Sequence, residues 1–396
     1  MSIPYRFASL FSGCGGLDLG FSNAGFTPAV AFDNDEAAIM NHRRHFQSPA
    51  FRTDLRDGLP LEHRLCGIDA LIAGPPCQGF STAGKRRFDD DRNHLLTLTG
   101  VLARRVRPRV VVVENVAGAL SGEHARYWHE LTAMMRDAGY RTHALDCQAA
   151  ELGMAQMRRR MLLLAWRTGR EARFPLPRLS PGRLADSLRS VSGVANHKPQ
   201  PLKRGSVERR IATRIQPGQK LCNVRGGANA IPTWSIPEVF GDVSSEEVTV
   251  LEMLRRLRRQ DRARTFGDAD PVSLPRLETA LGTPFKRLLH SLIKKGYIRR
   301  NGDHLDLAHT FNGKYRRLSW DGPSYTVDTR FGAPRYFLHP DEHRGFTVRE
   351  AARIQGFPDD YIFHGSEQAQ YRLIGNAVPP PLAELAARFT AHLLGA

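Results

Sequence analysis

A cysteine in a proline-containing turn is the most reactive candidate in the chain. Residues 74–79 are Gly-Pro-Pro-Cys-Gln-Gly, and they follow an apolar run, 69–73, that predicts a buried strand. A single cysteine is most often a small buried hydrophobic residue. Here two prolines restrict the backbone of a polar turn, which a core position does not need and a nucleophile with a defined approach angle does. We therefore predict that Cys77 attacks a substrate at the end of this strand.

A carboxylate and two arginines accompany two other expected strands. Glu114 directly follows the apolar residues 110–113, so it is expected at the same edge of a sheet as Cys77, where it could hold or accept a proton. A turn or capping role is the alternative. Arg158 and Arg160 precede the apolar run 161–166, and alternation places both on one side. Together they could hold a carboxylate or a base edge, although a solvated charge run is the commoner arrangement.

A glycine-rich segment predicts a ligand-binding loop. Residues 11–21, Phe-Ser-Gly-Cys-Gly-Gly-Leu-Asp-Leu-Gly-Phe, follow an expected strand and begin a helix, so the backbone can approach a ligand at the helix N-terminus. Asp33 lies 20 residues after Gly13, where a carboxylate can bind ribose hydroxyls. On these two features an adenosine-type cofactor is predicted, with NAD as plausible as any other.

The elements that must position these residues alternate along residues 1–167. Short apolar runs and amphipathic stretches in alternation predict an α/β fold with a parallel, doubly wound sheet, which binds ligands at the carboxyl ends of its strands. Strands are expected at 5–11, 28–32, 70–73, 110–114, 143–146 and 161–166, and helices at 18–23, 36–46, 94–105 and 123–138.

The middle of the chain differs in composition. Residues 170–245 are rich in Pro, Gly, Arg and Ser and predict irregular structure. Residues 246–308 predict three helices and a hairpin turning at Asn301-Gly302, which is the order of a winged helix. That interpretation places Lys286 and Arg287 on a recognition helix and Arg299 near the wing. A small insert that only packs is the alternative.

Positive charge is concentrated in the same region. The chain has 57 Lys and Arg against 40 Asp and Glu, and residues 171–320 hold 28 of the basic residues and 14 of the acidic ones. An excess confined to one block favours a polyanion such as nucleic acid over a merely solvated surface.

Length and composition exclude several classes of protein. A chain of 396 residues predicts at least two domains. No apolar run approaches 18 residues, and the N-terminus lacks a secretory signal. Five cysteines without a CxxC pair predict neither a disulfide scaffold nor a zinc site. We therefore expect no metal and no membrane span, and a cytoplasmic, nucleoid-associated protein.

Five motifs in order resemble the cytosine-5 DNA methyltransferases, of the prokaryotic modification type. They begin at Phe11, Gly74, Glu114, Gln156 and Gly375, the last being Gly-Asn-Ala-Val-Pro-Pro. The resemblance covers residues 6–167 and 316–394, while residues 170–315 look like the family's variable target-recognition region. It implies a Rossmann-like domain that binds S-adenosylmethionine and a smaller, basic recognition domain.

The resemblance also implies roles for the predicted site. Cys77 matches the nucleophile that adds to cytosine C6, and Glu114 the carboxyl that binds N3 and the exocyclic amine. Arg160 matches the arginine that contacts O2, and Arg158 its companion near the thiolate, whose fraction a nearby cation would raise. The target base would be flipped out of duplex DNA.

Further residues are implied to bind cofactor or DNA. The cofactor residues would be Phe11, Gly13, Gly15, Asp33, Asp54, Pro75, Leu95, Asn376 and Ala377. The loop after Cys77 would close on DNA and present Ser81, Lys85, Arg86 and Arg87. The expected domains are 1–170 with 376–396 for catalysis, 171–340 for recognition including the insert 246–308, and 341–375 as a return segment.

Two other functions remain open at this point. The tRNA-methylating branch shares the fold, although a large basic recognition region favours duplex DNA. A catalytically silent DNA-binding regulator is the other, and intact Cys77, Glu114 and Arg160 argue against it. We expect a monomer on DNA with a restriction endonuclease or another defence protein as partner.

Overall fold

The computed structural model describes residues 5–58, 65–76, 94–120, 122, 125–223, 227–260, 270–282, 285–309 and 311–396. The chain divides into two units. Unit 1 comprises Met1–His197, Trp320–Arg330 and Val348–Ala396, and unit 2 comprises Lys198–Ser319 and Phe331–Thr347. The sheet that carries the candidate site lies in unit 1.

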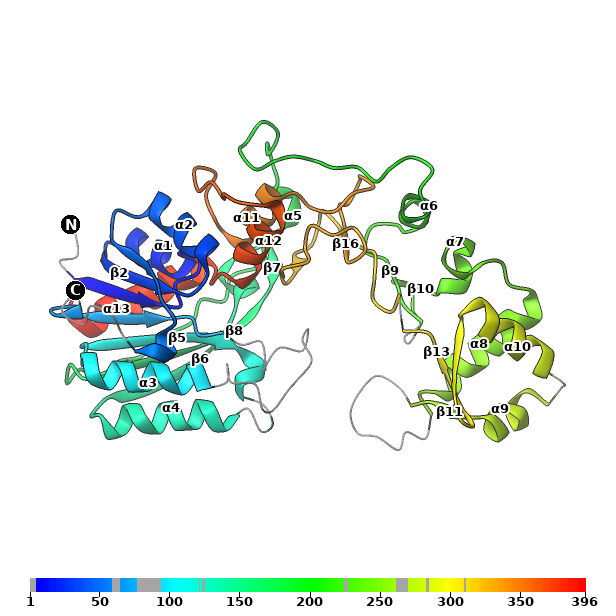
Figure 1. Ribbon diagram of the computed structural model, residues 1–396, viewed down its shortest axis with the longest axis horizontal. Helices are drawn as coiled ribbons and strands as arrows, with labels where there is room; N and C mark the ends of the chain where they lie inside the picture. The colour runs from blue at the N-terminus through cyan, green and yellow to red at the C-terminus, as the bar shows by residue number, and fades with distance from the viewer. Residues whose placement is uncertain are drawn as a thin grey trace. The chain divides into compact units, whose positions relative to one another are not determined.

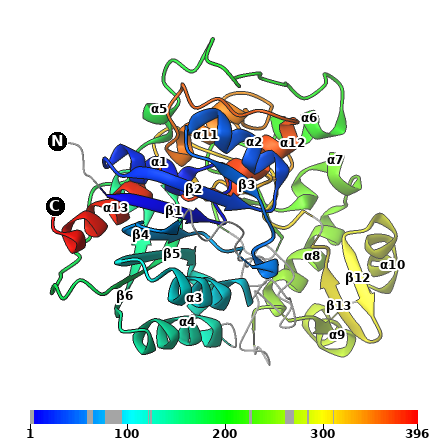
Figure 2. The same ribbon diagram turned by 60° about the vertical axis from the view of Figure 1, so that its left-hand side comes forward.

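Unit 1 is built on a seven-stranded sheet with the order β3-β2-β1-β4-β5-β8-β6 (Figures 1 and 2). Five neighbouring strands, β3 to β5 in that order, pair in parallel. The expected strands are all present, and β3 is one that the sequence analysis missed because it has only three residues. The bounds are β1 Arg6–Leu10, β2 Thr27–Asp33, β3 Ala50–Arg52, β4 Ala70–Ala73, β5 Val110–Val116, β6 Arg141–Gln148 and β8 Arg159–Trp166.

The prediction of a wholly parallel sheet is wrong for β8. This strand pairs antiparallel with both β5 and β6, so the sheet is mixed. The reason is the connection from β6, which spans only residues 149–158 and contains a short 3-10 turn and the two-residue strand β7 (Gln156–Met157). A parallel crossover needs a dozen or more residues and usually a helix, so the chain can only turn back.

The two faces of the sheet follow the alternation of apolar residues along the strands. Val111 and Val113 of β5 belong to a core that includes α3 and α4, whereas Val110 and Val112 belong to a core with α1 and α13. The helices of each core are drawn on opposite sides of the sheet in Figure 1. Their bounds are α1 Gly16–Asn23, α3 His94–Val106, α4 Ala125–Asp137 and α13 Pro380–Leu394.

Unit 1 is completed by α2 and by short elements from later in the chain. Helix α2 packs Ile39 against Ala31 and Ala50 of the sheet and begins where the Asp35 side chain accepts the Ala37 N–H. The two-residue strand β15 pairs with β7. The bounds are α2 Glu36–His45, α5 Leu184–Ser187, β15 Ser324–Tyr325, α11 Val348–Gln355 and α12 Glu367–Asn376.

Unit 2 begins with short elements around a buried arginine. The Arg317 guanidinium donates to the carbonyl oxygens of Ile215 at 2.6 Å, Ala212 at 2.8 Å and His339 at 2.6 Å, so one side chain connects residues 212–215 and residue 339 to its own strand. The elements are α6 Val207–Thr213, β9 Lys220–Leu221, β10 Ala230–Ile231, α7 Pro237–Phe240, β14 Arg316–Arg317 and β16 Phe337–Leu338.

The rest of unit 2 is a helix–hairpin body, which we define as the described residues of 244–309. Its elements follow in the order α8, β11, α9, α10, β12 and β13, and the strands form an antiparallel sheet with the order β11-β13-β12. Leu251, Leu277 and Leu292, one from each helix, are fully buried in its core. The bounds are α8 Ser245–Leu257, β11 Val272–Ser273, α9 Leu274–Leu281, α10 Lys286–Lys295, β12 Ile298–Asn301 and β13 His304–Leu307.

This division differs from the domain bounds expected from sequence. Residues 171–197 and 348–375 group with the sheet, although the sequence analysis assigned them to the recognition domain and the return segment. The Arg349 backbone N–H donates to the Asn196 carbonyl at 3.1 Å, and the Asn196 side chain donates to the Phe363 carbonyl at 2.9 Å. These contacts join the two stretches to each other, and the Leu179 N–H donates to the Glu151 carbonyl at 2.8 Å, which connects the first stretch to the rest of unit 1. Which residues form the functional domains stays a prediction.

Close packing of α1 on α13 generates the first prediction. A Cβ at Gly20 would lie 2.3 Å from Ala383 Cβ and 2.6 Å from the Pro380 carbonyl oxygen. We expect Gly20→Ala to lower the free energy of unfolding by about 1–3 kcal/mol, because the helices must separate. Gly322→Ala is the matched control, since a Cβ there meets no atom within 4 Å, and its effect should stay within about 0.5 kcal/mol. Urea unfolding measures both, and equal effects would contradict the close packing.

Candidate active site

The carboxyl ends of four neighbouring strands bring the predicted site residues to one edge of the sheet. The glycine-rich loop follows β1, Asp33 ends β2, the Gly74–Pro76 turn follows β4, and Glu114 lies near the end of β5. Parallel pairing puts these ends side by side. This edge is where an α/β sheet of this kind binds ligands.

The loop after β1 has a backbone suited to a ligand. Phe11, Gly13 and Gly15 adopt φ values of 53°, 56° and 89°. The Gly13 N–H donates to Asp33 Oδ2 at 2.8 Å, and the Asp35 N–H donates to Asp33 Oδ1 at 2.8 Å. Burial raises the pKa of Asp33, and these backbone N–H groups oppose that rise. The carboxylate therefore orients the loop and keeps acceptor capacity, because each of its oxygens can take a second hydrogen bond.

A buried polar triad beneath this loop was missed by the sequence analysis. Asp18 on α1 is fully buried, accepts the Ser9 hydroxyl at 2.9 Å and lies 3.0 Å from His42 Nε2. The His42 ring stacks on Phe46 with centroids 4.4 Å apart. A Cβ at Gly15 would meet the Phe46 ring at 2.4 Å, so the loop, α1 and α2 are packed together. Asp18 lies inside the glycine motif, but no local pattern pairs it with a histidine 24 residues away.

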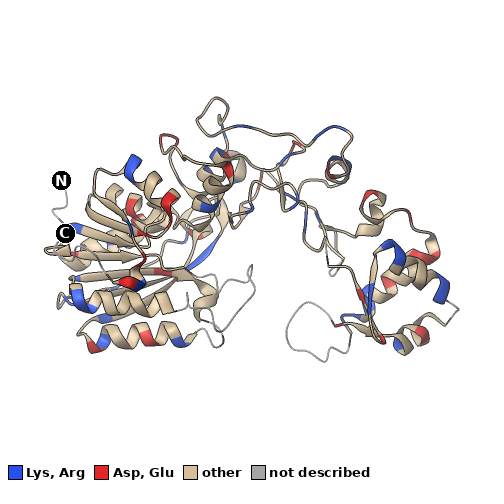
Figure 3. Cartoon of the chain, viewed as in Figure 1, with Lys and Arg blue, Asp and Glu red and all other residues tan. Residues whose placement is uncertain are grey.

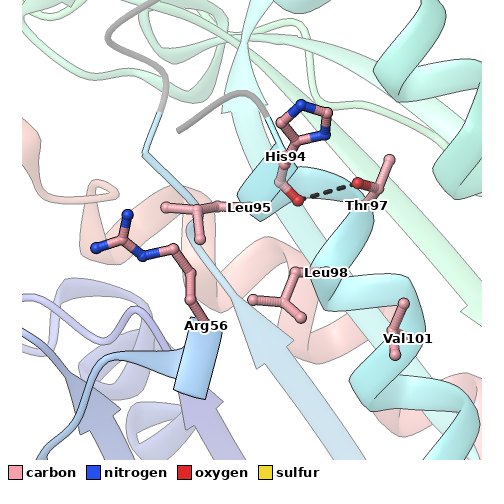
Figure 4. Close-up of a pocket in the computed structure, with 6 residues that line it drawn as sticks. All are labelled: Arg56, His94, Leu95, Thr97, Leu98 and Val101. Atoms are coloured by element: carbon pink, nitrogen blue, oxygen red, sulfur yellow. Dashed lines mark hydrogen bonds between the residues drawn. The ribbon is translucent and has the colours of Figure 1, made fainter. Parts of the chain in front are cut away.

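A small cavity lies beside the start of α3, and Figure 4 shows its lining residues. Its volume is about 290 Å³, and the predicted cofactor residue Leu95 contributes to an apolar wall that Arg56 borders. Arg56 also pairs with Asp54 at 2.5 Å, and this hydrogen-bonded partner lowers the pKa of the Asp54 carboxyl. Asp54 is therefore held ionised near the cavity without being part of its lining.

Glu114 and Arg160 form an ion pair. Glu114 Oε1 lies 2.8 Å from Arg160 Nε, and the two side chains are only 10 % and 12 % exposed. The antiparallel register pairs Val116 with Arg160 and Glu114 with Leu162, so the two charged residues are diagonal neighbours on β5 and β8. A second donor of Arg160, Nη1, binds the Arg159 carbonyl at 2.8 Å and restrains the guanidinium.

Asn115 connects this pair to the proline turn. Its side-chain N–H₂ donates to the Pro75 carbonyl at 3.3 Å, and its Oδ1 accepts the Val116 N–H at 2.8 Å. The residue is fully enclosed, with 1 % of its surface exposed. Asn115 therefore braces the turn at Pro75, two residues before Cys77.

Arg158 and Arg160 have different hydrogen-bond partners, which corrects the expectation that the two arginines hold one group together. Its guanidinium is 2 % exposed and donates to the carbonyl oxygens of Val327 at 2.9 Å, Gly375 at 3.2 Å and Ala377 at 2.9 Å. Arg158 precedes β8, so strand alternation does not govern its direction. Its role near a thiolate stays a prediction, and its observed contacts hold chain segments together.

The last motif is held by the same network. The Gln156 side chain donates to Gln355 Oε1 at 2.8 Å, and Gln355 donates to the Ala377 carbonyl at 2.8 Å. A Cβ at Gly375 would lie 2.5 Å from the backbone of Asp328, so only glycine fits there. Asn376 ends α12 with an exposed side chain, and Ala377 is buried. The main chain at these two predicted cofactor residues is thus fixed by buried hydrogen bonds.

The remaining predicted residues lie either outside the described residues or in unit 2. Cys77, Ser81, Lys85, Arg86 and Arg87 lie outside the described residues, as does the predicted closing loop. Lys286 and Arg287 are exposed in the first turn of α10, and Arg299 on β12 is exposed with Asp306 3.9 Å away.

The described part of the chain offers no metal-ligand cluster and no membrane-spanning helix. There, no group of three or more His, Cys, Asp or Glu side chains is arranged to hold a metal ion. None of the helices described combines the length and the apolar character that crossing a membrane requires.

Solved structures that align with this chain over its whole length include methyltransferases. A DNA modification methyltransferase encoded within a prophage (E. coli) aligns with a TM-score of 0.61 at 22% identity, covering 99% of this chain and 100% of that chain. The EhMeth methyltransferase of Entamoeba histolytica aligns with a TM-score of 0.55 at 13% identity, and both chains are covered completely. These similarities establish the fold.

The chain belongs to the C-5 cytosine-specific DNA methylase family, which it matches over residues 5–390. It is 30% identical to the Type II methyltransferase M.AgeI of Thalassovita gelatinovora, covering 94% of this chain and 96% of that protein. It is 27% identical to the Type II methyltransferase M1.HphI of Haemophilus parahaemolyticus, covering 97% and 85%. The resemblance seen in the motifs is confirmed, and the protein is an enzyme of this family.

The different surroundings of the two arginines generate the second prediction. Arg158→Met should lower the free energy of unfolding by about 2–5 kcal/mol, because it leaves buried carbonyl oxygens without donors. Arg160→Met should abolish most methyl transfer, because it removes the partner of Glu114. Thermal unfolding and methyl transfer measured on both variants test this. A stable Arg158→Met enzyme would contradict the structural role of Arg158.

Proposed function

We propose that this enzyme is a modification methyltransferase that transfers a methyl group from S-adenosylmethionine to C5 of a cytosine in duplex DNA. The observation that carries the proposal is the Glu114–Arg160 pair, which shares a sheet edge with the turn leading to Cys77. The relatives named Type II methyltransferases support a role beside a restriction endonuclease, as a protein that marks the cell's own DNA.

The residues of the glycine loop fit S-adenosylmethionine. The positive φ angles at Gly13 and Gly15 expose backbone to a ligand, and a Cβ at Gly13 would meet no atom within 4 Å, so space is open there. Asp33 would accept hydrogen bonds from the ribose hydroxyls, and the apolar wall at Leu95 would suit the adenine ring. Bound in this way, S-adenosylmethionine supplies an electrophilic methyl group.

The other four cysteines are poor nucleophiles for this edge. Burial raises the pKa of both Cys14 and Cys147 to about 12, so neither forms a thiolate readily. Cys222 is buried and donates to Asn312 Oδ1 at 3.1 Å. Cys66 is exposed but precedes β4, at the amino end of the strand. These observations support the proposal that Cys77, which follows the carboxyl end of β4 in the sequence, is the nucleophile.

In the proposed reaction the Cys77 thiolate forms a bond to C6 of the cytosine. The C5–C6 π electrons then shift to C5, which forms a bond to the methyl carbon as the methyl–sulfur bond of S-adenosylmethionine breaks, and S-adenosylhomocysteine is the leaving group. Removal of the C5 proton by a base and breaking of the S–C6 bond restore the ring and the thiolate. Asn115 would serve as a positioning residue, because its hydrogen bond to the Pro75 carbonyl restrains the turn that carries Cys77.

Glu114 and Arg160 would hold the base during this addition. The Glu114 carboxyl can accept from the exocyclic amine and, when protonated, donate to N3, which draws electron density from the ring and favours attack at C6. Arg160 would donate to O2 with guanidinium N–H groups beyond the two already used. A base inside a duplex cannot reach these groups, so the reaction requires it to be flipped out at a cost of a few kcal/mol.

Radiolabelled methyl transfer tests the function and the nucleophile together. With labelled S-adenosylmethionine, wild-type enzyme should label duplex DNA and not tRNA. Cys77→Ser should abolish turnover because a hydroxyl does not ionise at neutral pH. Cys66→Ser, which removes an exposed thiol elsewhere, should remain active. Label on tRNA alone would indicate the tRNA-methylating branch, and label on neither would favour a silent DNA-binding protein.

The buried carboxylate predicts a pH dependence of cofactor binding. Because burial raises the folded-state pKa of Asp33 above 3.8, the carboxylate should be lost at a higher pH than for an exposed aspartate. Affinity for S-adenosylmethionine should fall as pH falls through that raised pKa. The free energy of unfolding of the cofactor-free protein should instead rise as pH falls through that pKa, since the folded state binds this proton more tightly than the unfolded state does.

Calorimetric titration of the cofactor across a pH series measures this effect. Asp33→Asn should weaken binding about 10- to 100-fold at neutral pH and remove the acidic decline. Asp57→Asn, at an exposed position close in sequence to Asp54, serves as the control and should keep the wild-type profile. An acidic decline that persists in Asp33→Asn would sink the assignment to Asp33.

A further inference from the structure

The helix–hairpin body of unit 2 has a segment without acidic residues. Residues 279–302 contain no Asp or Glu, and they include all of α10 and β12. The same stretch has six basic residues, Lys286, Arg287, Lys294, Lys295, Arg299 and Arg300. Blue segments mark Lys and Arg in α10 and in the hairpin in Figure 3. Ordinary protein surfaces intersperse both signs of charge, so this stretch is unusual.

Helix α10 sorts its residues into two opposite faces. Leu289 and Leu292 are buried in the core of the body. Four residues on the opposite side of the helix are all exposed: Lys286, Arg287, His290 and Lys294. We call these four residues the α10 stripe.

The carboxylates of the body leave this stripe largely uncompensated. Glu247 is 2.7 Å from Lys295, which lies off the stripe, and it also accepts the Ser291 hydroxyl. Asp306 on the hairpin pairs with Arg258 at 2.5 Å. The described carboxylate that approaches the stripe is Glu278, with an oxygen 4.0 Å from Lys286 Nζ. The acidic groups therefore stabilise the body internally and do not cancel the charge of its α10 surface.

The body presents α10 rigidly. The Tyr297 hydroxyl after α10 donates to the Gly241 carbonyl at 2.6 Å, and Lys295 Nζ donates to the Asp242 carbonyl at 2.8 Å. Gly296 ends the helix with φ 91°. The end of α10 is thus fixed to the segment before α8, and the helix can meet a partner without first becoming ordered.

We propose that the helix–hairpin body docks on duplex DNA, with the α10 stripe in the major groove and Arg299 and Arg300 of β12 against the phosphate backbone. This inference rests on the proposed function, which makes DNA the substrate. The major groove admits one α-helix, and a stripe of basic side chains neutralises phosphates on either side of it. A helix followed by a basic hairpin matches a recognition helix and wing. The body adds DNA affinity that the catalytic sheet does not supply.

The test measures DNA binding by the full-length chain as a function of salt. The probe is a fluorescent duplex that contains the sequence the wild-type enzyme methylates, identified by bisulfite sequencing. The variant Lys286→Ala/Arg287→Ala/Lys294→Ala should weaken binding at least tenfold at about 0.15 M salt. The slope of log Kd against log salt should become shallower by about 2–3, since each phosphate contact contributes about 0.9.

The matched control removes three positive charges from two helices of unit 1. Arg104 and Arg105 are exposed in the last turn of α3, and Arg388 is exposed on α13. The control variant Arg104→Ala/Arg105→Ala/Arg388→Ala should keep the wild-type salt slope. If the α10 variant and the control variant have the same slope of log Kd against log salt, the inference is overturned, whether or not that slope differs from the wild-type value. Circular dichroism and thermal unfolding of each variant report whether both units are folded.

A second variant and the wild-type assay make the outcome decisive. If the α10 variant does not fold, Arg299→Ala/Arg300→Ala is measured in its place, with an expected decrease of the slope by about 1–2. Wild-type enzyme that binds DNA through α10 but transfers no methyl group would contradict the proposed function and support this inference. An active enzyme with an unchanged slope in the α10 and hairpin variants would contradict this inference alone.

Discussion

The antiparallel pairing of β8 with β5 is the constraint on which the described site depends. A parallel strand in that position would run its carboxyl end to the ligand edge and carry Arg160 to the opposite edge. Because β8 runs the other way, its first residues meet the last residues of β5, and Arg160 lies 2.8 Å from Glu114. Two strand ends thus contribute opposite charges to one small region, where low exposure strengthens their attraction.

The same reversal explains the buried polar network next to the site. The short connection before β8 contains Gln156 and Arg158, whose side chains bind backbone groups near residues 327, 355 and 375–377. A guanidinium out of water is tolerated when it is well hydrogen-bonded, and here carbonyl oxygens accept from both terminal nitrogens of Arg158. The network therefore holds the C-terminal motif against a sheet formed by the first half of the chain.

The spacing of apolar residues along the chain predicted the main strands and helices, because each is long enough to show the repeat of a strand or a helix. Strand β4 was expected at its observed bounds, and α3 was expected to within one residue. Strand β3 was missed since three residues do not display alternation. The direction of β8 was wrong because apolar alternation is the same in parallel and antiparallel strands, and only the length of the connection decides between them.

By itself, the sequence determined the family, the order of the strands and helices, the position of the glycine loop and the charge of the middle region. These properties depend on residue types at fixed spacings along the chain. The tertiary structure alone decided that Arg160 meets Glu114 while Arg158 binds carbonyl groups, that Asn115 braces the Pro75 turn, and that Asp18 and His42 meet beneath the loop. Such contacts join residues distant in the chain, and their partners are selected by strand direction and packing, which no local spacing encodes.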